Sequence, residues 1–452
     1  MRFTFHTSIL VLCCQLLFAQ GGTSPSGAFN PEPQARSGPA RVTYVKCGAL
    51  FDGMSDHVRR SVTVVIDNDR IRELASAAPP AGGNVIDLSS MTCLPGLIDT
   101  HTHTLLNGDI TAEDYDVQLL KQSVAYRAIA ATANARKMLG YGFTTIRDLE
   151  TEGAGYADVD LRNAINRGIV PGPRMKVASR ALDVTGSYPL QGYNWQIEVP
   201  HGVQFCDAAD DCRKAVREQL SHGADWIKVY VDRTYYVQQQ NGGEILNDIP
   251  TFTIDELRAI VDEAHRERHL VAAHAMALQG VHNAVEAGVD TIEHGDYIAP
   301  TDMQTMAQKG IWWVPTIYVG EYVAQGRAKE GAPVWVQMIK ISQDTFRRGL
   351  QSGVKMAFGT DVGGFDWNID PAVQLPLMVK YGMSPLQALR AVTSQAATLM
   401  RMEDQIGSIS PGKFADLVAV QGDPLGDINV MQKVQFVMKG GEVFASPQKG
   451  RP

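Results

Sequence analysis

The chain has 452 residues, of which 44% are hydrophobic and 20% are charged, with a formal net charge of −8. A chain of this length and composition can bury one large core and a smaller one, as an ordinary globular enzyme does. It has no long basic run and no interleaving of basic with aromatic residues, which argues against a nucleic-acid partner.

The beginning of the chain predicts an exported protein. Arg2 precedes a short apolar stretch, Ser8–Ala19, which is typical of a secretory signal peptide over residues 1–20. A buried N-terminal helix is the alternative, and a lipoprotein signal is disfavoured because leucine precedes the first of the two cysteines. Residues 21–41 are rich in Gly, Pro, Ser and Gln and predict a flexible leader. No later stretch has the apolar length of a membrane helix, so we expect a secreted or periplasmic protein without a membrane span.

Short β-like runs occur near both ends of the chain. They cover residues 42–45, 62–66, 85–88, 415–420 and 434–438. Lys439 to Glu442, with two glycines between them, predict a hairpin turn after the last of these runs. Two β-rich ends that flank a different middle predict one small β-sandwich domain, assembled from residues 42–93 and 405–446.

The middle of the chain, residues 94–404, alternates helical patterns with short apolar runs. The helical patterns cover 117–139, 208–222, 254–268 and 301–309. The apolar runs cover 94–103, 143–147, 175–179, 226–230, 270–274, 291–294, 312–316 and 356–361. Eight strand–helix units over about 300 residues are typical of a (β/α)8 TIM barrel, an α/β fold. A doubly wound open sheet is the alternative, but no Gly-rich phosphate loop follows the first strand.

Candidate metal ligands lie where these strands end. His101 and His103 close the first strand, and because residues i and i+2 share a strand face, both can bind one metal ion. The other candidates at or near strand ends are Lys228, His274, His294 and Asp361. Singly, a histidine can be a satisfied core residue and a lysine can reach the surface. Together they lie on the face of the barrel that carries chemistry, which favours a shared site.

These residues and two longer motifs resemble the amidohydrolase superfamily. The motifs are Leu-Pro-Gly-Leu-Ile-Asp-Thr-His-Thr-His at 94–103 and Pro-Gly-Lys-Phe-Ala-Asp-Leu-Val at 411–418. The resemblance covers residues 42–445. Within the superfamily, the chain resembles the imidazolonepropionase-related branch. That branch includes exported Xaa-Pro dipeptidases, carboxypeptidases that release proline, lysine, arginine or an apolar residue from an N-acyl group, and ochratoxin-type amidohydrolases.

The resemblance implies a binuclear metal centre. Its ligands would be His101, His103 and Asp361 for the more buried ion, and His274 and His294 for the other. Imidazole and carboxylate ligands suit zinc. Lys228 would carry a carbamate formed with CO2 that bridges both ions, since burial favours the neutral amine that CO2 attacks. The alternative is a single metal ion beside an ordinary barrel lysine.

The resemblance also implies an amide hydrolysis in which Asp361 acts first as base and then as acid. Tyr230, two residues beyond Lys228 and so on the same strand face, is the candidate hydrogen-bond donor to the carbonyl oxygen or the substrate carboxylate. A packing tyrosine is the alternative. Arg180, near the end of the third strand, or the loop 185–188 is the candidate for binding the substrate's terminal carboxylate.

Aromatic residues near several strand ends favour an apolar or aromatic leaving amino acid. They are Tyr235, Tyr236, Trp312, Trp313, Tyr318 and Trp367, and the alternative is that they belong to the core. Export makes disulfides admissible, and Cys206 with Cys212 is the expected pair, whereas Cys47 and Cys93 are expected as small buried hydrophobes.

Three functions compete. The first, which we favour, is an exported amide hydrolase acting on N-acyl amino acids or dipeptides. The second is a cyclic-amide hydrolase of the imidazolonepropionase kind, a cytosolic role that the signal peptide argues against. The third is a non-catalytic barrel, which need not keep Lys228 or Asp361. We expect a small-molecule or dipeptide substrate and a homo-oligomer.

Overall fold

The structure is a computed structural model that describes residues 42–446 except 77–78, 109, 189, 191 and 241–242. The predicted signal peptide (1–20) and leader (21–41) lie outside the described residues. Within the described residues, no helix is long and apolar enough to cross a membrane.

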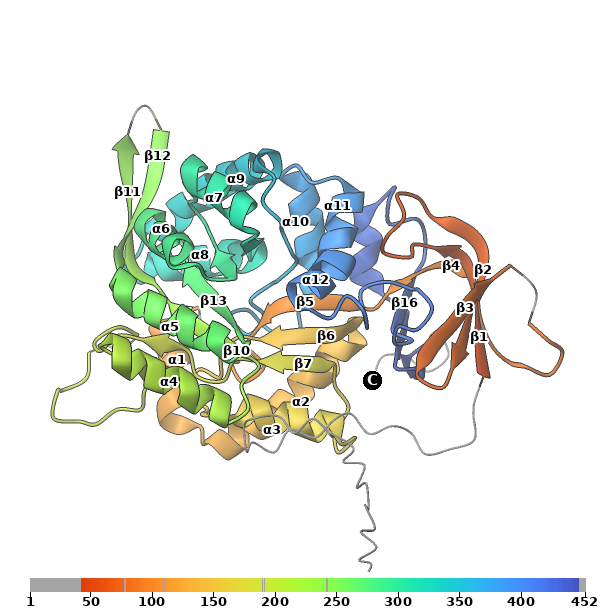
Figure 1. The fold of residues 1–452 in the computed structure, drawn as a ribbon, viewed down its shortest axis with the longest axis horizontal. Helices are drawn as coiled ribbons and strands as arrows, with labels where there is room; N and C mark the ends of the chain where they lie inside the picture. The colour runs from red at the N-terminus through yellow and green to blue at the C-terminus, as the bar shows by residue number, and fades with distance from the viewer. Residues whose placement is uncertain are drawn as a thin grey trace, which may run out of the picture.

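Seven strands form one sheet that takes strands from both ends of the chain, at the right of Figure 1. Their order is β18 (Glu442–Ala445), β17 (Phe436–Lys439), β16 (Leu417–Val420), β4 (Asn84–Pro95), β1 (Val42–Leu50), β2 (Arg59–Asp67) and β3 (Arg70–Ala75). The long strand β4 runs parallel to β1 and antiparallel to β16. The described residues of the two ends thus share a single sheet, where the sequence predicted the two packed sheets of a sandwich. The predicted turn at 439–442 joins β17 to β18.

Cys47 and Cys93 form a disulfide, which corrects the expectation that they are free buried hydrophobes. Although the two residues are 46 positions apart, the parallel pairing of β1 with β4 brings their Cα atoms to 5.8 Å. The expected Cys206–Cys212 disulfide is present at the start of α4 (Ala209–Ser221).

The barrel is built from two parallel groups of strands. One group is β5 (Leu97–Thr102), β6 (Phe143–Asp148) and β7 (Arg174–Val177). The other is β8 (Leu182–Asp183), β9 (Gln204–Phe205), β10 (Trp226–Tyr230), β13 (Leu270–Ala275), β14 (Thr291–His294) and β15 (Trp312–Val314). The backbone N–H of Asp225 donates to the Val177 carbonyl at 2.7 Å and links the two groups.

The predicted eighth strand, 356–361, is irregular. Its only ladder contact among the described residues is an isolated bridge from Met356 to Trp313. Even so, the Ala357 N–H donates to the Trp313 carbonyl at 3.1 Å, and the Thr100 N–H donates to the Phe358 carbonyl at 3.0 Å. The segment therefore joins β15 to β5 and closes the barrel.

Helices cover the outside of the barrel (Figure 1). They are α3 (Ala157–Asn166), α4, α5 (Ile254–Arg266), α6 (Leu278–Ala287), α7 (Pro300–Lys309), α8 (Ile317–Lys329), α9 (Val334–Ser352), α10 (Gln374–Lys380), α11 (Pro385–Arg390), α12 (Ala396–Leu399) and the short η1 (Pro371–Val373), η2 (Ala391–Gln395) and η3 (Ile428–Lys433). The helix expected at 117–139 is two helices, α1 (Ala112–Lys121) and α2 (Val124–Gly140). The break arises because Ser123 is extended and its side chain caps α2.

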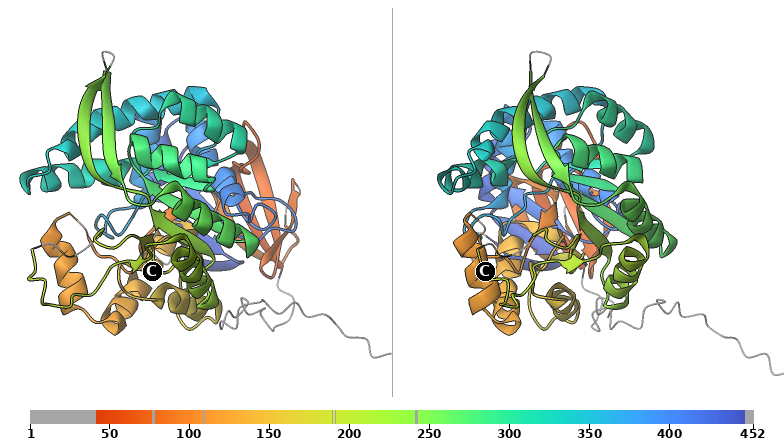
Figure 2. Two further views of the ribbon diagram at one scale, coloured as in Figure 1. Left: turned by 60° about the vertical axis from the view of Figure 1, so that its left-hand side comes forward. Right: turned by 90° about the vertical axis from the view of Figure 1, so that its left-hand side faces the viewer.

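A two-stranded hairpin leaves the barrel just after β10. It consists of β11 (Asp232–Gln240) and β12 (Gly243–Pro250), which pair antiparallel and project from the rest of the molecule (Figures 1 and 2). The pairing shifts register between Arg233 and Tyr236, so the strand is bulged where it leaves the barrel. This bulge matters for the site described next.

Candidate active site

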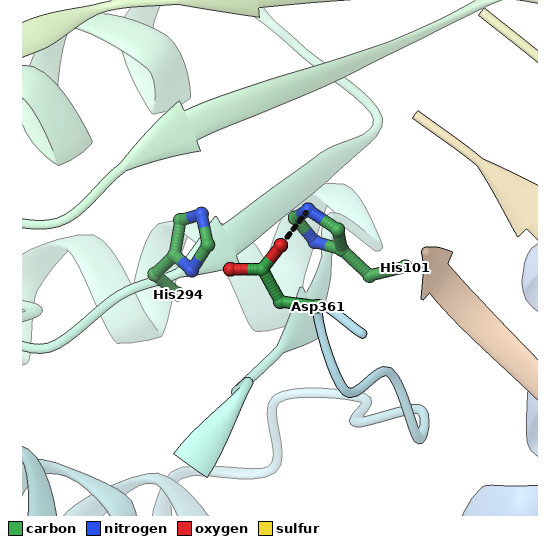
Figure 3. Close-up of side chains that lie close together, drawn as sticks. All are labelled: His101, His294 and Asp361. Carbon is green, nitrogen blue, oxygen red and sulfur yellow. Dashed lines mark ion pairs between the residues drawn. The ribbon is translucent and has the colours of Figure 1, made fainter. Parts of the chain in front are cut away.

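The structure brings all six predicted ligands together at the C-terminal ends of the barrel strands. The Nε2 atoms of His101 and His103 lie 3.2 Å apart, and Asp361 Oδ1 lies 3.0 Å from His103 Nε2 and 3.6 Å from His101 Nε2. The ring centroids of His294 and His101 are 5.0 Å apart. Figure 3 shows Asp361 between these two rings. One ligand atom from each of these three residues falls within 4.8 Å of the others.

Lys228 and His274 complete the group. Lys228 Nζ lies 3.5 Å from His101 Nε2, and only 1% of the residue is exposed. Burial is the main cause that lowers the pKa of Lys228, although nearby carboxylates oppose it. The His274 ring centroid lies 4.6 Å from that of His294. The lysine therefore faces the histidines from inside the barrel, where burial disfavours its charged form.

His101 is held by a buried ion pair. Its Nδ1 lies 2.9 Å from Glu293 Oε2, and Glu293 Oε1 accepts a hydrogen bond from Arg147 at 2.8 Å. All three side chains are fully buried, and the Arg147 guanidinium also stacks over Trp226 at 4.4 Å. A carboxylate on Nδ1 fixes the ring and leaves the Nε2 lone pair for a ligand.

The rings of His294 and His103 are also held by a hydrogen bond at Nδ1. His294 Nδ1 is hydrogen bonded to Thr316 Oγ1 at 2.7 Å, and His103 Nδ1 to the Glu150 carbonyl oxygen at 3.3 Å. Burial holds the pKa of His294 well below its usual range, so the ring is neutral and can be a ligand. In both rings Nε2 is the nitrogen left for the centre.

Backbone strain also positions the ligands. His294 and Asp361 have left-handed φ values of +70° and +63°. This conformation costs a non-glycine residue about 1–3 kcal/mol and concentrates at functional sites. Because Glu293 and His294 are neighbours, strand alternation alone would point them to opposite faces. The left-handed turn at His294 lets its ring approach the same buried centre that Glu293 reaches.

The donor set fits divalent metal ions. Four imidazoles and a carboxylate are ligands that zinc and related ions bind, and at least three rings have an oriented Nδ1 or Nε2. His274 Nε2 is hydrogen bonded to Tyr235 at 2.9 Å, which leaves its Nδ1. The ligand atoms of His101, His294 and Asp361 lie close enough together to share one cation, which would compensate the charge of Asp361 in this largely buried site.

A cavity of about 270 Å3 opens onto this group. It is lined by five of the six candidate ligands, all except His101, and by Tyr230, Arg233, Tyr235, Arg327 and Trp335. Its apolar lining includes Met276, Val319 and Val323. A larger hollow of about 730 Å3 lies beside β12 and α9 and contains none of the candidate ligands.

Tyr230 lines the cavity and Arg180 does not. The Tyr230 hydroxyl donates to Glu150 Oε2 at 2.6 Å, and burial together with Glu150 raises the pKa of Tyr230 well above its usual range. The Arg180 guanidinium instead donates to the Val203 carbonyl at 3.4 Å. The Arg180 backbone N–H donates to Gln219 on α4, so this part of the chain is tied to the outer helix layer.

The aromatic residues expected around the substrate divide in the same way. Of the six, only Tyr235 lines the cavity, and Tyr236 is 50% exposed on the hairpin. Trp313 and Trp367 are core residues whose indole N–H groups donate to the backbone carbonyls of His294 and Leu106. The aromatic wall is completed by Trp335, which the sequence did not single out, and by Tyr188 of the predicted carboxylate-binding loop 185–188. Ser187 of that loop also lines the cavity.

Two glutamates after β6 were also missed. Glu150 and Glu152 are buried beside His103, and a ligand atom from each lies within 4.8 Å of the other two. Glu150 Oε1 has no hydrogen-bond partner among the described residues, and Glu152 Oε2 accepts from Tyr188 at 3.0 Å. Their i, i+2 spacing at a strand end, the same signal as in His101 and His103, would have identified them.

Comparison with known proteins identifies the family. Residues 92–444 match the Amidohydrolase family. Ochratoxinase from Aspergillus niger is 28% identical over 91% of this chain and 88% of its own length. Imidazolonepropionase from Micrococcus luteus is 21% identical over 80% of this chain and 87% of its own length.

Solved structures agree. A Xaa-Pro dipeptidase with bound methionine is 33% identical, with a TM-score of 0.81 over 90% of this chain and 100% of that one. The A. niger ochratoxinase structure is 26% identical, with a TM-score of 0.77 over 91% of this chain and 97% of that one. Since the match spans most of the chain and the candidate ligands converge in one cavity, the chain belongs to the Amidohydrolase family and is a hydrolase of carbon–nitrogen bonds.

Proposed function

We propose that this protein is an exported, binuclear metal-dependent hydrolase that cleaves the amide bond of N-acyl amino acids or dipeptides. The observation that carries the proposal is the convergence of Lys228 with four histidines and Asp361 at one cavity. A scaffold has no need to bury a lysine 3.5 Å from a histidine nitrogen. Buried charged groups of this kind are costly unless they serve a site.

We assign His101, His103 and Asp361 to one metal ion and His274 and His294 to the other, with zinc the expected metal. When bound, the ions supply an activated water and polarise the scissile carbonyl. Lys228, with its lowered pKa, is suited to react as the free amine with CO2, losing a proton, and the resulting carbamate would add an anionic metal ligand to the site.

Asp361 is the proposed proton carrier. Its carboxylate accepts the proton of the attacking water and delivers it to the leaving nitrogen, so that the amide is hydrolysed to an acid and an amine. Tyr230 is the proposed hydrogen-bond donor to the carbonyl oxygen or the substrate carboxylate. Its raised pKa keeps the hydroxyl protonated, and its one hydrogen, which is bonded to Glu150 in this structure, would turn to the substrate.

An apolar or aromatic leaving residue fits the cavity lining best. Met276, Val319, Val323 and Trp335 form an apolar wall, and the indole of Trp335 packs against Tyr235 with ring centroids 6.1 Å apart. Such a wall favours an apolar side chain over a charged one. The names of two relatives, ochratoxinase and Xaa-Pro dipeptidase, support amide substrates, including ochratoxin-type amides.

Export and assembly are part of the proposal. The Cys47–Cys93 and Cys206–Cys212 disulfides support folding in an oxidising compartment, since such bonds are rare in the cytosol. We propose a secreted or periplasmic location for the mature chain, cleaved after the signal peptide, and a homo-oligomeric state.

Cyclic-amide hydrolysis is the second candidate, favoured by the similarity to imidazolonepropionase.

The test combines metal analysis with a substrate panel. We expect about two zinc ions per chain and turnover of N-acetyl amino acids or dipeptides with an apolar C-terminal residue. Lys228→Ala should lose both the second metal ion and turnover. Lys176→Ala is the matched control, because Lys176 also lies on a barrel strand but pairs with Asp225 at 3.1 Å. Turnover of a cyclic amide alone would replace the proposal by its second candidate.

A further inference from the structure

Arg233 is an exposed cation that lines the cavity and lies at a distortion of the hairpin. It lies five residues after Lys228 in the sequence and lines the same cavity as Lys228, His274 and Asp361. The register shift between Arg233 and Tyr236 falls directly on it. Bulges of this kind re-aim a side chain at the edge of a site.

The backbone on both sides of Arg233 is fixed. The buried carboxylate of Asp232 accepts the backbone N–H groups of Met276 and Ala277 at 2.7 and 3.0 Å, which ties the start of β11 to the end of β13. On the other side, Thr234 has a left-handed φ of +57°. The position of Arg233 is therefore set by its neighbours and does not depend on a partner for its own side chain.

The guanidinium keeps donors for another group. Its Nη1 donates to the Gly186 carbonyl at 3.2 Å, from the loop that follows β8. Within the described part of the chain, Arg233 forms no ion pair with a carboxylate. Asp183, the acid that it influences, accepts the Val184 N–H through Oδ1 at 2.8 Å, and its Oδ2 has no hydrogen-bond partner among the described residues. A guanidinium has five N–H donors in a fork that matches a carboxylate, and the hydrogen bond to Gly186 uses one of them.

The other cations near the cavity have different surroundings. Lys228 lies among the metal ligands, and Arg327 stacks over Trp335 at 4.1 Å on the apolar wall. Arg180 is outside the cavity and donates to the Val203 carbonyl. Among these four cations, Arg233 lines the cavity, has a backbone held by its neighbours, and has guanidinium N–H groups without a hydrogen-bond partner among the described residues.

We propose that Arg233 binds the α-carboxylate of the leaving amino acid, and thereby makes the enzyme select substrates with a free C-terminal carboxylate. This inference rests on the proposed function. It assigns the carboxylate contact to the hairpin that follows the lysine strand, in place of the two candidates that the sequence suggested, Arg180 and the loop 185–188. The chemical class of the substrate becomes an N-acyl amino acid with a free acid group.

The experiment compares N-acetyl-L-phenylalanine with its C-terminal carboxamide, with release of the amino acid or its amide followed by chromatography. The zinc-loaded wild type should prefer the free acid by about 10- to 100-fold in kcat/KM, the range of a hydrogen bond to a charged group. Arg233→Gln should bring this ratio close to one, mainly through KM for the acid. Arg233→Lys should restore part of it. Arg180→Gln, the matched control, should keep the wild-type ratio.

The outcomes separate the two proposals. Turnover of the acid and the amide at equal rates by the wild type overturns the carboxylate contact but leaves amide hydrolysis in place. An unchanged acid preference in Arg233→Gln also overturns it, and loss of the preference in Arg180→Gln would assign the contact to the third strand. If the wild type cleaves neither compound nor any other member of the panel, the proposed function fails and this inference fails with it. If Arg233→Gln does not fold, Arg233→Lys is the test. Loss of the guanidinium fork should still lower the ratio of kcat/KM for the acid to that for the amide several-fold.

Discussion

Glu293 Oε2 lies 2.9 Å from Nδ1 of His101, and both side chains are completely buried. The other oxygen of the same carboxylate is paired with the buried Arg147. One carboxylate thus orients a candidate metal ligand and neutralises an arginine in the barrel interior. Stability of the barrel and affinity for the metal ion are therefore coupled through Glu293.

Glu293→Gln should weaken both properties. Loss of the carboxylate on His101 should lower zinc affinity by about 10- to 100-fold, because such partners set ring orientation and basicity. Removing one member of a buried pair leaves the Arg147 charge without compensation, which should lower the free energy of unfolding by about 3–5 kcal/mol. Zinc competition titration and urea unfolding measure the two effects.

A surface pair provides the control for that variant. Glu286 bonds Arg258 at 2.6 Å, and both side chains are about half exposed, at 48% and 51%. Glu286→Gln should change the free energy of unfolding by less than about 1 kcal/mol and leave zinc affinity unchanged. Equal zinc affinities in Glu293→Gln and wild type would contradict the assigned role of Glu293.

Tyr230→Phe should lower kcat more than it raises KM. If the hydroxyl stabilises the developing charge on the carbonyl oxygen, its loss should cost about 10²-fold in kcat. Steady-state kinetics on a cleaved dipeptide measure this. Tyr188→Phe is the control, since it also removes a hydroxyl that donates to a buried glutamate, Glu152, at 3.0 Å. Similar kcat losses in the two variants would mean that Tyr230 acts only by satisfying Glu150.

The two disulfides should differ in their contribution to stability. The Cys47–Cys93 bond closes a loop of 46 residues, and the Cys206–Cys212 bond a loop of 6. Loop-closure entropy predicts a loss of about 4 kcal/mol for Cys47→Ala/Cys93→Ala and about 2 kcal/mol for Cys206→Ala/Cys212→Ala. Urea unfolding of the two double variants under oxidising conditions would test the order, and the reverse order would refute the entropic account.

Asp183 should make stability fall as pH rises. Burial raises its pKa to about 7 in the folded chain, whereas an unfolded aspartate titrates near about 4. Between these values the folded state holds a proton that the unfolded state has lost, so stability is full below about pH 4 and falls through pH 7, by up to about 1.4 kcal/mol per pH unit. Asp183→Asn, which places a neutral amide where Oδ2 has no hydrogen-bond partner among the described residues, should remove this slope.

The free energy of unfolding of wild type and Asp183→Asn, measured at pH 4.5 and 7.5, tests this pH dependence. The Asn variant should gain stability relative to wild type at the higher pH. A stability difference that is the same at both pH values would mean that Asp183 is ionised throughout this range.

The barrel and its ligand set could be predicted because both leave local patterns. Alternation of strands and helices gave the fold class, and the strand-end positions of His101, His274 and Asp361 indicated a shared site. Strand pairing over long separations leaves no such pattern. The Cys47–Cys93 disulfide depends on the register of β1 with β4, and the single sheet depends on the pairing of β4 with β16.

The second feature that could not be predicted from the sequence is the direction of side chains where the backbone is irregular. Arg180 and Arg233 both follow short barrel strands, and only the bulge after Arg233 distinguishes them. Likewise, the direction of the His294 ring depends on a left-handed φ of +70°, which strand alternation does not predict. Such conformations are chosen by tertiary contacts rather than by the residue's own preference.

The position of β4 has a consequence for how the chain reaches this fold. β4 runs into β5 after a single residue, yet one of its edges pairs with residues 417–420. During synthesis, every strand of the barrel is therefore made before that edge can be covered. An uncovered strand edge invites association with other chains. We expect newly made chains to depend on chaperones until residue 420 is available, and truncations before residue 417 to aggregate even though they retain the whole barrel.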